Sequence, residues 1–160
     1  MNNTIRQRLT VWALILGCVV CGCTRNNGDI GSKFGLWKLA AMTVDGAPNP
    51  DYEGNIFWGF QSGSLTFTTA EYTNGIPANL NTPGHLVFAG WSEADGYIIV
   101  DTDFRDDQGT YRYTPPAVLM LPEQTAGIRL KILSEDSRKM ELEQITAEGT
   151  RIVYSLRKWS

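Results

Sequence analysis

Acidic side chains gather in one short stretch of the chain, where six carboxylates lie between positions 93 and 107. They are Glu93, Asp95, Asp101, Asp103, Asp106 and Asp107. Several oxygen ligands in one loop suit calcium, and paired carboxylates are also the equipment of glycoside hydrolysis. Arg105, however, stands where an EF-hand loop has its third ligand, and the glycine and closing glutamate of that loop are missing. The favoured interpretation is therefore a solvated acidic rim, with no metal and no catalytic pair expected.

His85 is the only histidine of the chain. A general base or a metal ligand needs partner groups that converge on it, and there is no second histidine to supply one. We expect His85 to lie at a strand end and to face solvent. Because a nucleophile, a base and a metal set are all missing, the sequence predicts neither an enzyme nor a cofactor.

The three cysteines, at positions 18, 21 and 23, all lie near the N-terminus, so none is left for a disulfide or a zinc site in a folded domain. They follow Arg6, Arg8 and an apolar run from Leu9 to Val20. That run is shorter than the roughly 18 residues that a membrane-spanning helix needs. It fits the apolar region of a secretion signal instead.

The residues Val20-Cys21-Gly22-Cys23 resemble the lipobox of bacterial lipoproteins, in which an aliphatic and two small residues precede a lipid-bearing cysteine. A competing site, at Cys18, places the large Leu16 where a small residue is preferred. The resemblance implies a signal peptide over residues 1–22 and acyl chains on Cys23 that hold the protein at a membrane. Thr24 is not the aspartate of an inner-membrane retention signal, so the expected location is the outer membrane, facing the periplasm. The polar residues 23–33 are expected to form a flexible tether.

The chain has 160 residues, which favours one folded domain, over 34–160. Removing residues 1–22 leaves 12 basic and 17 acidic residues, a net charge near −5. This balance predicts no nucleic-acid partner.

The sequence from residue 34 onward breaks into short runs separated by turn residues, without an amphipathic stretch of helical period. We expect strands over 36–44, 55–61, 65–69, 85–91, 97–104, 128–133, 139–145 and 150–158. Alternation is clearest near the C-terminus, where Ile128, Leu130 and Ile132 point one way and Arg129 and Lys131 the other. Eight strands, each with one apolar face, predict an all-β, antiparallel up-and-down barrel, since closure removes unpaired edges.

The connection over 105–127 is the exception to the strand pattern. Its apolar part, 114–122, begins with Thr114-Pro115 and ends at Pro122, which predicts a short helical turn before the sixth strand. A segment this apolar must lie against other residues. It is expected either to plug one end of the barrel or to form a lid over a cavity.

Gly35-Leu36-Trp37 resembles the Gly-x-Trp motif of lipocalins. In that family the tryptophan closes the base of the barrel and a basic residue of the last strand packs over its ring. The resemblance assigns that second role to Arg157 or Lys158. The domain as a whole resembles the small lipocalin-like lipoproteins of Bacteroidetes-type bacteria. The residues that carry this likeness are 36–39, 55–61, 114–115, 132–134 and 156–158.

The leading functional hypothesis is a binding module that holds a small hydrophobic ligand in the barrel or at its mouth. The candidate ligand-binding residues are Leu39, Trp58, Phe60, Phe67, Phe88, Trp91, Ile99, Leu130 and Met140. The alternative is an accessory envelope lipoprotein with a side-chain-filled barrel and no ligand, which docks a protein through its outer face or the connections 70–84 and 105–127.

Overall fold

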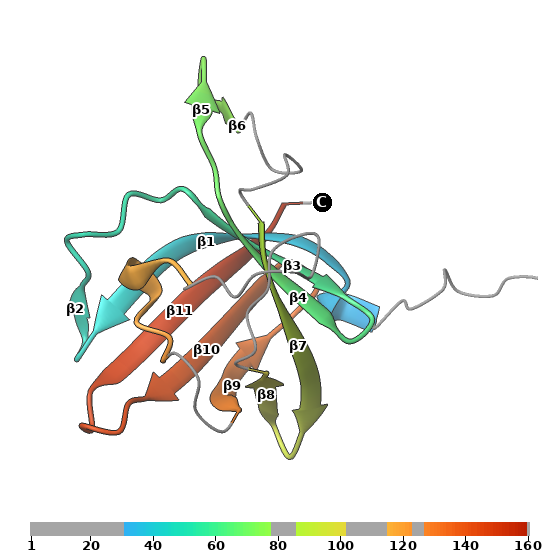
Figure 1. Cartoon of the computed structure of the whole chain (residues 1–160), viewed down its shortest axis with the longest axis vertical. Coiled ribbons are helices and arrows are strands. Elements are labelled where there is room, and N and C mark those ends of the chain that lie inside the picture. The colour runs from blue at the N-terminus through green and yellow to red at the C-terminus, as the bar shows by residue number, and fades with distance from the viewer. Residues whose placement is uncertain (1–30, 78–85, 102–114, 123–126, 160) are drawn as a thin grey trace, which may run out of the picture.

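Eight antiparallel strands follow one another around a closed barrel in the computed structural model of the chain (Figure 1). In order they are β1 (Gly35–Val44), β3 (Ile56–Gln61), β4 (Ser64–Thr69), β7 (Leu86–Ala94), β8 (Tyr97–Val100), β9 (Ile128–Glu135), β10 (Lys139–Ile145) and β11 (Arg151–Lys158). Pairing of β11 with β1 closes the ring. The predicted up-and-down barrel is therefore confirmed.

The structure describes residues 31–77, 86–101, 115–122 and 127–159. The signal segment, Cys23, His85, Asp103, Asp106 and Asp107 lie outside the described residues, as does the end of the strand expected over 97–104. Three two-residue strands were not predicted: β2 (Ala47–Pro48) extends the sheet beside β1, and β5 (Tyr72–Thr73) pairs with β6 (Ile76–Pro77) in a small separate ribbon.

Turn chemistry sets the strand register. Asp95 and Gly96, which join β7 to β8, both have positive φ, at 53° and 76°. Two such residues form the tight hairpin turn whose twist matches that of the flanking strands, and Ala94 accordingly pairs with Tyr97. From this pair onward β8 is held in register, which turns Ile98 and Val100 toward the interior.

Side chains from all eight strands meet in one apolar cluster inside the barrel. Trp58 lies at its centre, with its ring centroid 4.9 Å from that of Phe67 and 5.3 Å from that of Tyr154. The members on the C-terminal strands are those whose alternation is visible in the sequence, such as Leu130, Leu142 and Leu156.

The predicted helical turn is present as the 3₁₀ turn η2 (Ala117–Leu119), which precedes the sixth barrel strand, β9. Leu119 is fully buried and, with Leu121, belongs to the apolar cluster. Of the two roles expected for this segment, the structure shows the plug. We refer to the end of the barrel that η2 covers as the mouth.

A second 3₁₀ turn, η1 (Gly31–Lys33), lies at the opposite end, where β1 begins (Figure 1). The tether was expected to extend to Lys33, but this side chain is buried. Residues 31–33 are held as η1 by contacts of Lys33 with distant strands.

Candidate functional site

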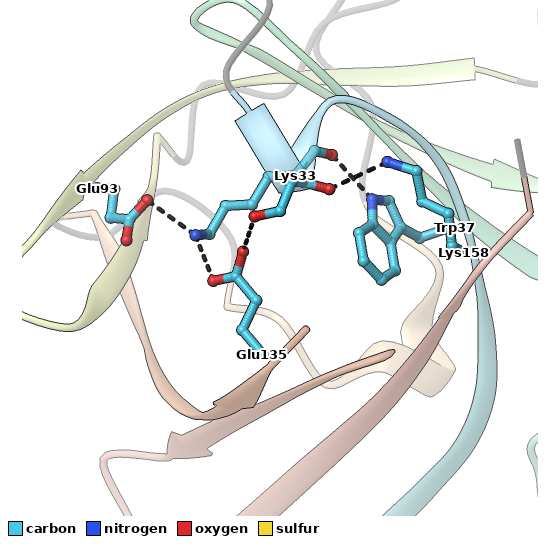
Figure 2. A network of polar contacts seen from close by, with 6 residues as sticks. Lys33, Trp37, Glu93, Glu135 and Lys158 are labelled. Atoms are coloured by element: carbon cyan, nitrogen blue, oxygen red, sulfur yellow. Dashed lines mark hydrogen bonds and ion pairs between the residues drawn. The ribbon is translucent and has the colours of Figure 1, made fainter. Parts of the chain in front are cut away.

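Trp37 closes the end of the barrel at which β1 begins, which we call the closed end. Its side chain is fully buried, and its indole N–H donates a hydrogen bond to the carbonyl oxygen of Lys33 over 2.8 Å (Figure 2). The ammonium of Lys158 lies 4.6 Å from the centre of the Trp37 rings and donates to the carbonyl oxygens of Phe34 and Ser32. Arg157, the other basic candidate, is exposed on the outer face. Gly35, the first residue of the motif, has a φ of 115° at the point where the chain leaves η1 for β1.

Lys33 holds η1 to the barrel through two glutamates from distant strands (Figure 2). Its ammonium lies 3.0 Å from the carboxylate of Glu93 on β7 and bonds that of Glu135 on β9, which also accepts a hydrogen bond from the Ser32 hydroxyl. We call these four residues the Lys33 network. Burial alone lowers the pKa of the Lys33 ammonium, but the hydrogen bonds and charges of Glu135 and Glu93 outweigh it, so the pKa lies above its usual value.

Most of the expected ligand-binding residues lie in the interior. Leu39, Trp58, Phe60, Phe67, Leu130 and Met140 are almost fully buried and belong to the apolar cluster. They form the packed middle of the barrel rather than an exposed surface. A ligand that reached them would have to displace their mutual contacts.

Two of the expected residues, Phe88 and Ile99, do not face the interior. Phe88 and Ile99 each lie between residues that face inward, Val87 and Ala89 in one case and Ile98 and Val100 in the other. Side chains alternate along a strand, so both point outward. The strand segments that contain Phe88 and Ile99 are apolar on both faces. The sequence therefore lacks the alternation that would have shown which side chains point outward.

Trp91 points inward but lies toward the closed end rather than at the mouth. Its ring packs edge-on against Phe60, with 5.2 Å between centroids, and its N–H donates to the carbonyl oxygen of Gln61 over 2.8 Å. Trp58 differs from the other two interior indoles, because its buried N–H has no hydrogen-bond acceptor among the described residues. The Trp58 N–H is thus a polar group that the described core leaves unsatisfied.

Hydrogen bonds fix the plug at the mouth. The buried hydroxyl of Tyr154 on β11 lies 2.6 Å from the carbonyl oxygen of Leu119 and 2.8 Å from the side-chain oxygen of Gln144 on β10. The amide nitrogen of Gln144 donates to the carbonyl oxygen of Met120 over 3.4 Å. Two neighbouring strands therefore hold the backbone of η2 at successive residues.

A pocket of about 600 Å³ lies beside the plug, between the end of η2, the start of β9 and the β10–β11 turn. Its lining is largely apolar and includes Met120, Pro122, Ile128 and Ile145; its polar members are Arg129, Gln144, Thr146 and Glu148. Met120 and Ile145 are 40% and 57% exposed. We call this the mouth pocket.

The backbone of Met120 has the left-handed conformation, with φ 53° and ψ 29°. A side chain other than glycine or asparagine is held in this conformation at a cost, and such strain concentrates at functional sites. The strained backbone turns an adaptable apolar side chain into the mouth pocket.

The described part of the acidic rim does not converge on a site. Glu93 belongs to the Lys33 network, and the backbone N–H of Asp101 donates to Gly90. Among the described residues no three histidine, cysteine, aspartate or glutamate side chains are grouped so as to hold a metal ion. Within the same part of the chain, no helix is long and apolar enough to cross a bilayer.

Sequence reasoning missed the mouth pocket and the Lys33 network. The pocket was signalled only indirectly, by an apolar segment between prolines that had to lie against the barrel. Lys33 gave no local signal, because Glu93 and Glu135 are 60 and 102 positions away in the sequence.

The fold of the chain matches that of a solved structure. A crystal structure of a lipocalin-like protein from Bacteroides uniformis is similar to this chain with a TM-score of 0.52. The fold is lipocalin-like. The match covers 81% of this chain and 100% of the other at 18% sequence identity, so the likeness is one of fold. No model of a known protein family matches the chain, and the comparison with curated proteins finds no match.

Proposed function

We propose that this protein is a lipid-anchored, lipocalin-like binding protein that holds a small hydrophobic molecule at the mouth of its barrel. The observation that carries this proposal is the mouth pocket, where exposed apolar side chains surround a hollow of about 600 Å³. That volume lies within the range of small-molecule sites, roughly 300–1,000 Å³. The lipocalin-like fold supports the same proposal, because a barrel of eight strands can hold one small ligand.

The lining indicates the chemistry of the ligand. Met120, Pro122, Ile128 and Ile145 offer apolar contact, whereas Arg129 offers a cationic donor and Glu148 a carboxylate at the wall. The Arg129 guanidinium is stacked 4.3 Å from the centre of the Tyr97 ring, which restricts its position. A molecule with an apolar body and one hydrogen-bond-accepting end fits this lining.

Displacement of a fluorescent fatty acid from the purified protein tests the proposed ligand class. Ile145→Asp removes apolar contact and adds a charge to the mouth pocket, so it is expected to weaken binding at least about tenfold. Leu133→Asp is the matched control, because Leu133 is similarly exposed, at 38%, but does not line the pocket. If the two variants bind equally well, the ligand is not at the mouth. If the unmodified protein binds no apolar probe, the accessory envelope role without a ligand is favoured.

We also propose that acyl chains on Cys23 hold the protein at the outer membrane, facing the periplasm. The apolar run ending at the lipobox-like residues supports this proposal. Intact mass measurement of protein extracted from membranes is expected to give a chain that begins at Cys23 and carries acyl groups. Cys23→Ser is expected to abolish the added mass, whereas Cys18→Ser is expected to leave it. If only the Cys18→Ser variant loses the lipid, the anchored residue is Cys18 and not Cys23.

A further inference from the structure

Three basic residues stand in one row on the outer face of the barrel. Lys38 on β1 pairs with Arg157 on β11, which in turn pairs with Lys139 on β10. Their chain neighbours Leu39, Leu156 and Met140 belong to the apolar cluster, so the three basic side chains point away from it. Like charges directly opposite each other on a sheet disfavour folding. Lys38, Arg157 and Lys139, which we call the basic row, therefore need an explanation outside the fold.

Within the described part of the chain the basic row makes no ion pair, although backbone hydrogen bonds and the nearby charge of Lys139 lower the pKa of Asp136. There, no carboxylate lies within ion-pairing distance of Lys38, Arg157 or Lys139. Arg157 and Lys139 instead border a groove of about 510 Å³ whose lining also contains Ala41 and Ser155. Glu141 and Asp136 lie in the same lining, so the groove carries charges of both signs.

Aromatic side chains lie at the Lys38 end of the basic row. The Lys38 ammonium is 5.3 Å from the centre of the Tyr72 ring and 5.9 Å from that of Trp159. Both rings are partly in solvent, with Tyr72 40% and Trp159 49% exposed. Tryptophan and tyrosine beside basic residues are the composition that membrane–water interfaces favour.

The N-terminal part of the chain enters the fold beside this face. The backbone N–H of Trp159 donates to the carbonyl oxygen of Leu36 over 2.8 Å, and Lys158 bonds Ser32 in η1. Gly31, where the described chain begins, is eight residues after Cys23. Eight residues span at most about 26–29 Å. A lipid on Cys23 would therefore keep Gly31, and with it the end of the barrel that carries the basic row, close to a bilayer.

We propose that the basic row, with Trp159 and Tyr72, docks on the lipid surface that carries the protein's own anchor and binds its phosphate headgroups. The inference rests on the lipid attachment in the proposed function, but not on ligand binding at the mouth. With a net charge near −5, the mature chain as a whole is repelled by an anionic surface, so docking depends on this local concentration of basic side chains. The mouth pocket lies at the other end of β11 and stays open to the aqueous phase.

The test is quenching of tryptophan fluorescence by brominated lipid, using the cell-processed protein reconstituted into phosphatidylcholine vesicles with or without phosphatidylglycerol. Trp159 is expected to be quenched in the anionic vesicles, and Trp159→Phe is expected to remove that quenching while Trp91→Phe keeps it. Arg157→Gln is expected to lower the docking constant about fivefold, since each basic residue near an anionic surface strengthens membrane binding by about this factor. Lys131→Gln, which removes one exposed positive charge from β9, is the matched control and is expected to have little effect.

Any of four results would overturn the proposal. One is protein that the vesicles retain but whose Trp159 is not quenched, and a second is an equal effect of Arg157→Gln and Lys131→Gln. The third is a much stronger reversal of the lipid quenching when inorganic phosphate is added than when chloride is added at the same ionic strength. That result would mean that the basic row binds a free anion. Protein that the vesicles do not retain shows a failure of the anchor and also overturns docking. Fatty-acid displacement by the same samples reports separately on the mouth pocket.

Discussion

At the scale of single residues, two tyrosine hydroxyls are bound to backbone carbonyl oxygens inside the fold. Burial raises the pKa of Tyr52, whose hydroxyl bonds Leu39, to about 12. Burial raises the pKa of Tyr154 as well. In the unfolded chain tyrosine loses its proton near pH 10. The folded chain therefore holds protons that the unfolded chain has released, and the free energy of unfolding should fall as the pH rises above about 10.

This linkage gives a prediction for Tyr154. Tyr154→Phe leaves the carbonyl oxygen of Leu119 and the side chain of Gln144 without their buried partner, so it should lower the free energy of unfolding at pH 7 by about 1–3 kcal/mol. It should also make the free energy of unfolding decrease less steeply above pH 10. One tyrosine contributes up to about 1.4 kcal/mol per pH unit between its pKa in the unfolded chain and its pKa in the folded chain. Urea denaturation between pH 7 and 11.5 measures both effects. Tyr97→Phe, at a ring covered by Arg129, serves as the control. An alkaline slope unchanged by Tyr154→Phe would contradict the linkage.

At the scale of elements, η1 is held by charge rather than by apolar burial. The side chain of Glu135 is 18% exposed and that of Glu93 44% exposed. Removing Lys33 thus leaves one largely buried carboxylate and one that water can still solvate. Lys33→Met is expected to lower the free energy of unfolding by about 1–3 kcal/mol, below the range for a fully buried pair. It should also increase hydrogen exchange of the Trp37 indole, whose acceptor is the carbonyl oxygen of Lys33.

The double variant Lys33→Met, Glu135→Leu separates two causes of the lost stability. One is the cost of leaving the Glu135 carboxylate buried without a partner, and the other is the loss of the ion pair itself. The double variant is expected to recover much of the stability, because an apolar pair replaces an uncompensated carboxylate. Lys131→Met, at an exposed position of β9, controls for the loss of a lysine and should have little effect. If Lys33→Met alone leaves stability and indole exchange unchanged, the network does not fix η1.

The elements themselves were largely predictable, and the reasons differ along the chain. Asp95-Gly96 and the alternation over Ile128 to Ile132 act locally, so turns and C-terminal strands follow from the sequence. The runs 87–89 and 97–100 are apolar at successive positions, and only pairing with their neighbours decides which side faces inward. The Lys33 network and the basic row depend on strand register across the closed barrel, which no local pattern contains. The left-handed backbone of Met120 likewise has no signal in the local sequence.

At the scale of the whole molecule, the two ends of the barrel differ in chemistry. The closed end combines Trp37, Lys158 and the Lys33 network beside the point where the chain enters. The mouth is plugged by Leu119 and bordered by exposed Met120 and Ile145. The proposed anchor at the N-terminus and the proposed binding site at the mouth therefore lie at opposite ends of the barrel.

The most direct test of ligand binding at the mouth is native mass spectrometry of the protein purified from its own cell envelope. The expected spectrum shows one bound molecule of lipid-like mass in addition to any acyl chains on Cys23, and Ile145→Asp should remove that molecule while Leu133→Asp retains it. A spectrum of the bare lipidated chain alone, with the fold intact, would contradict the account.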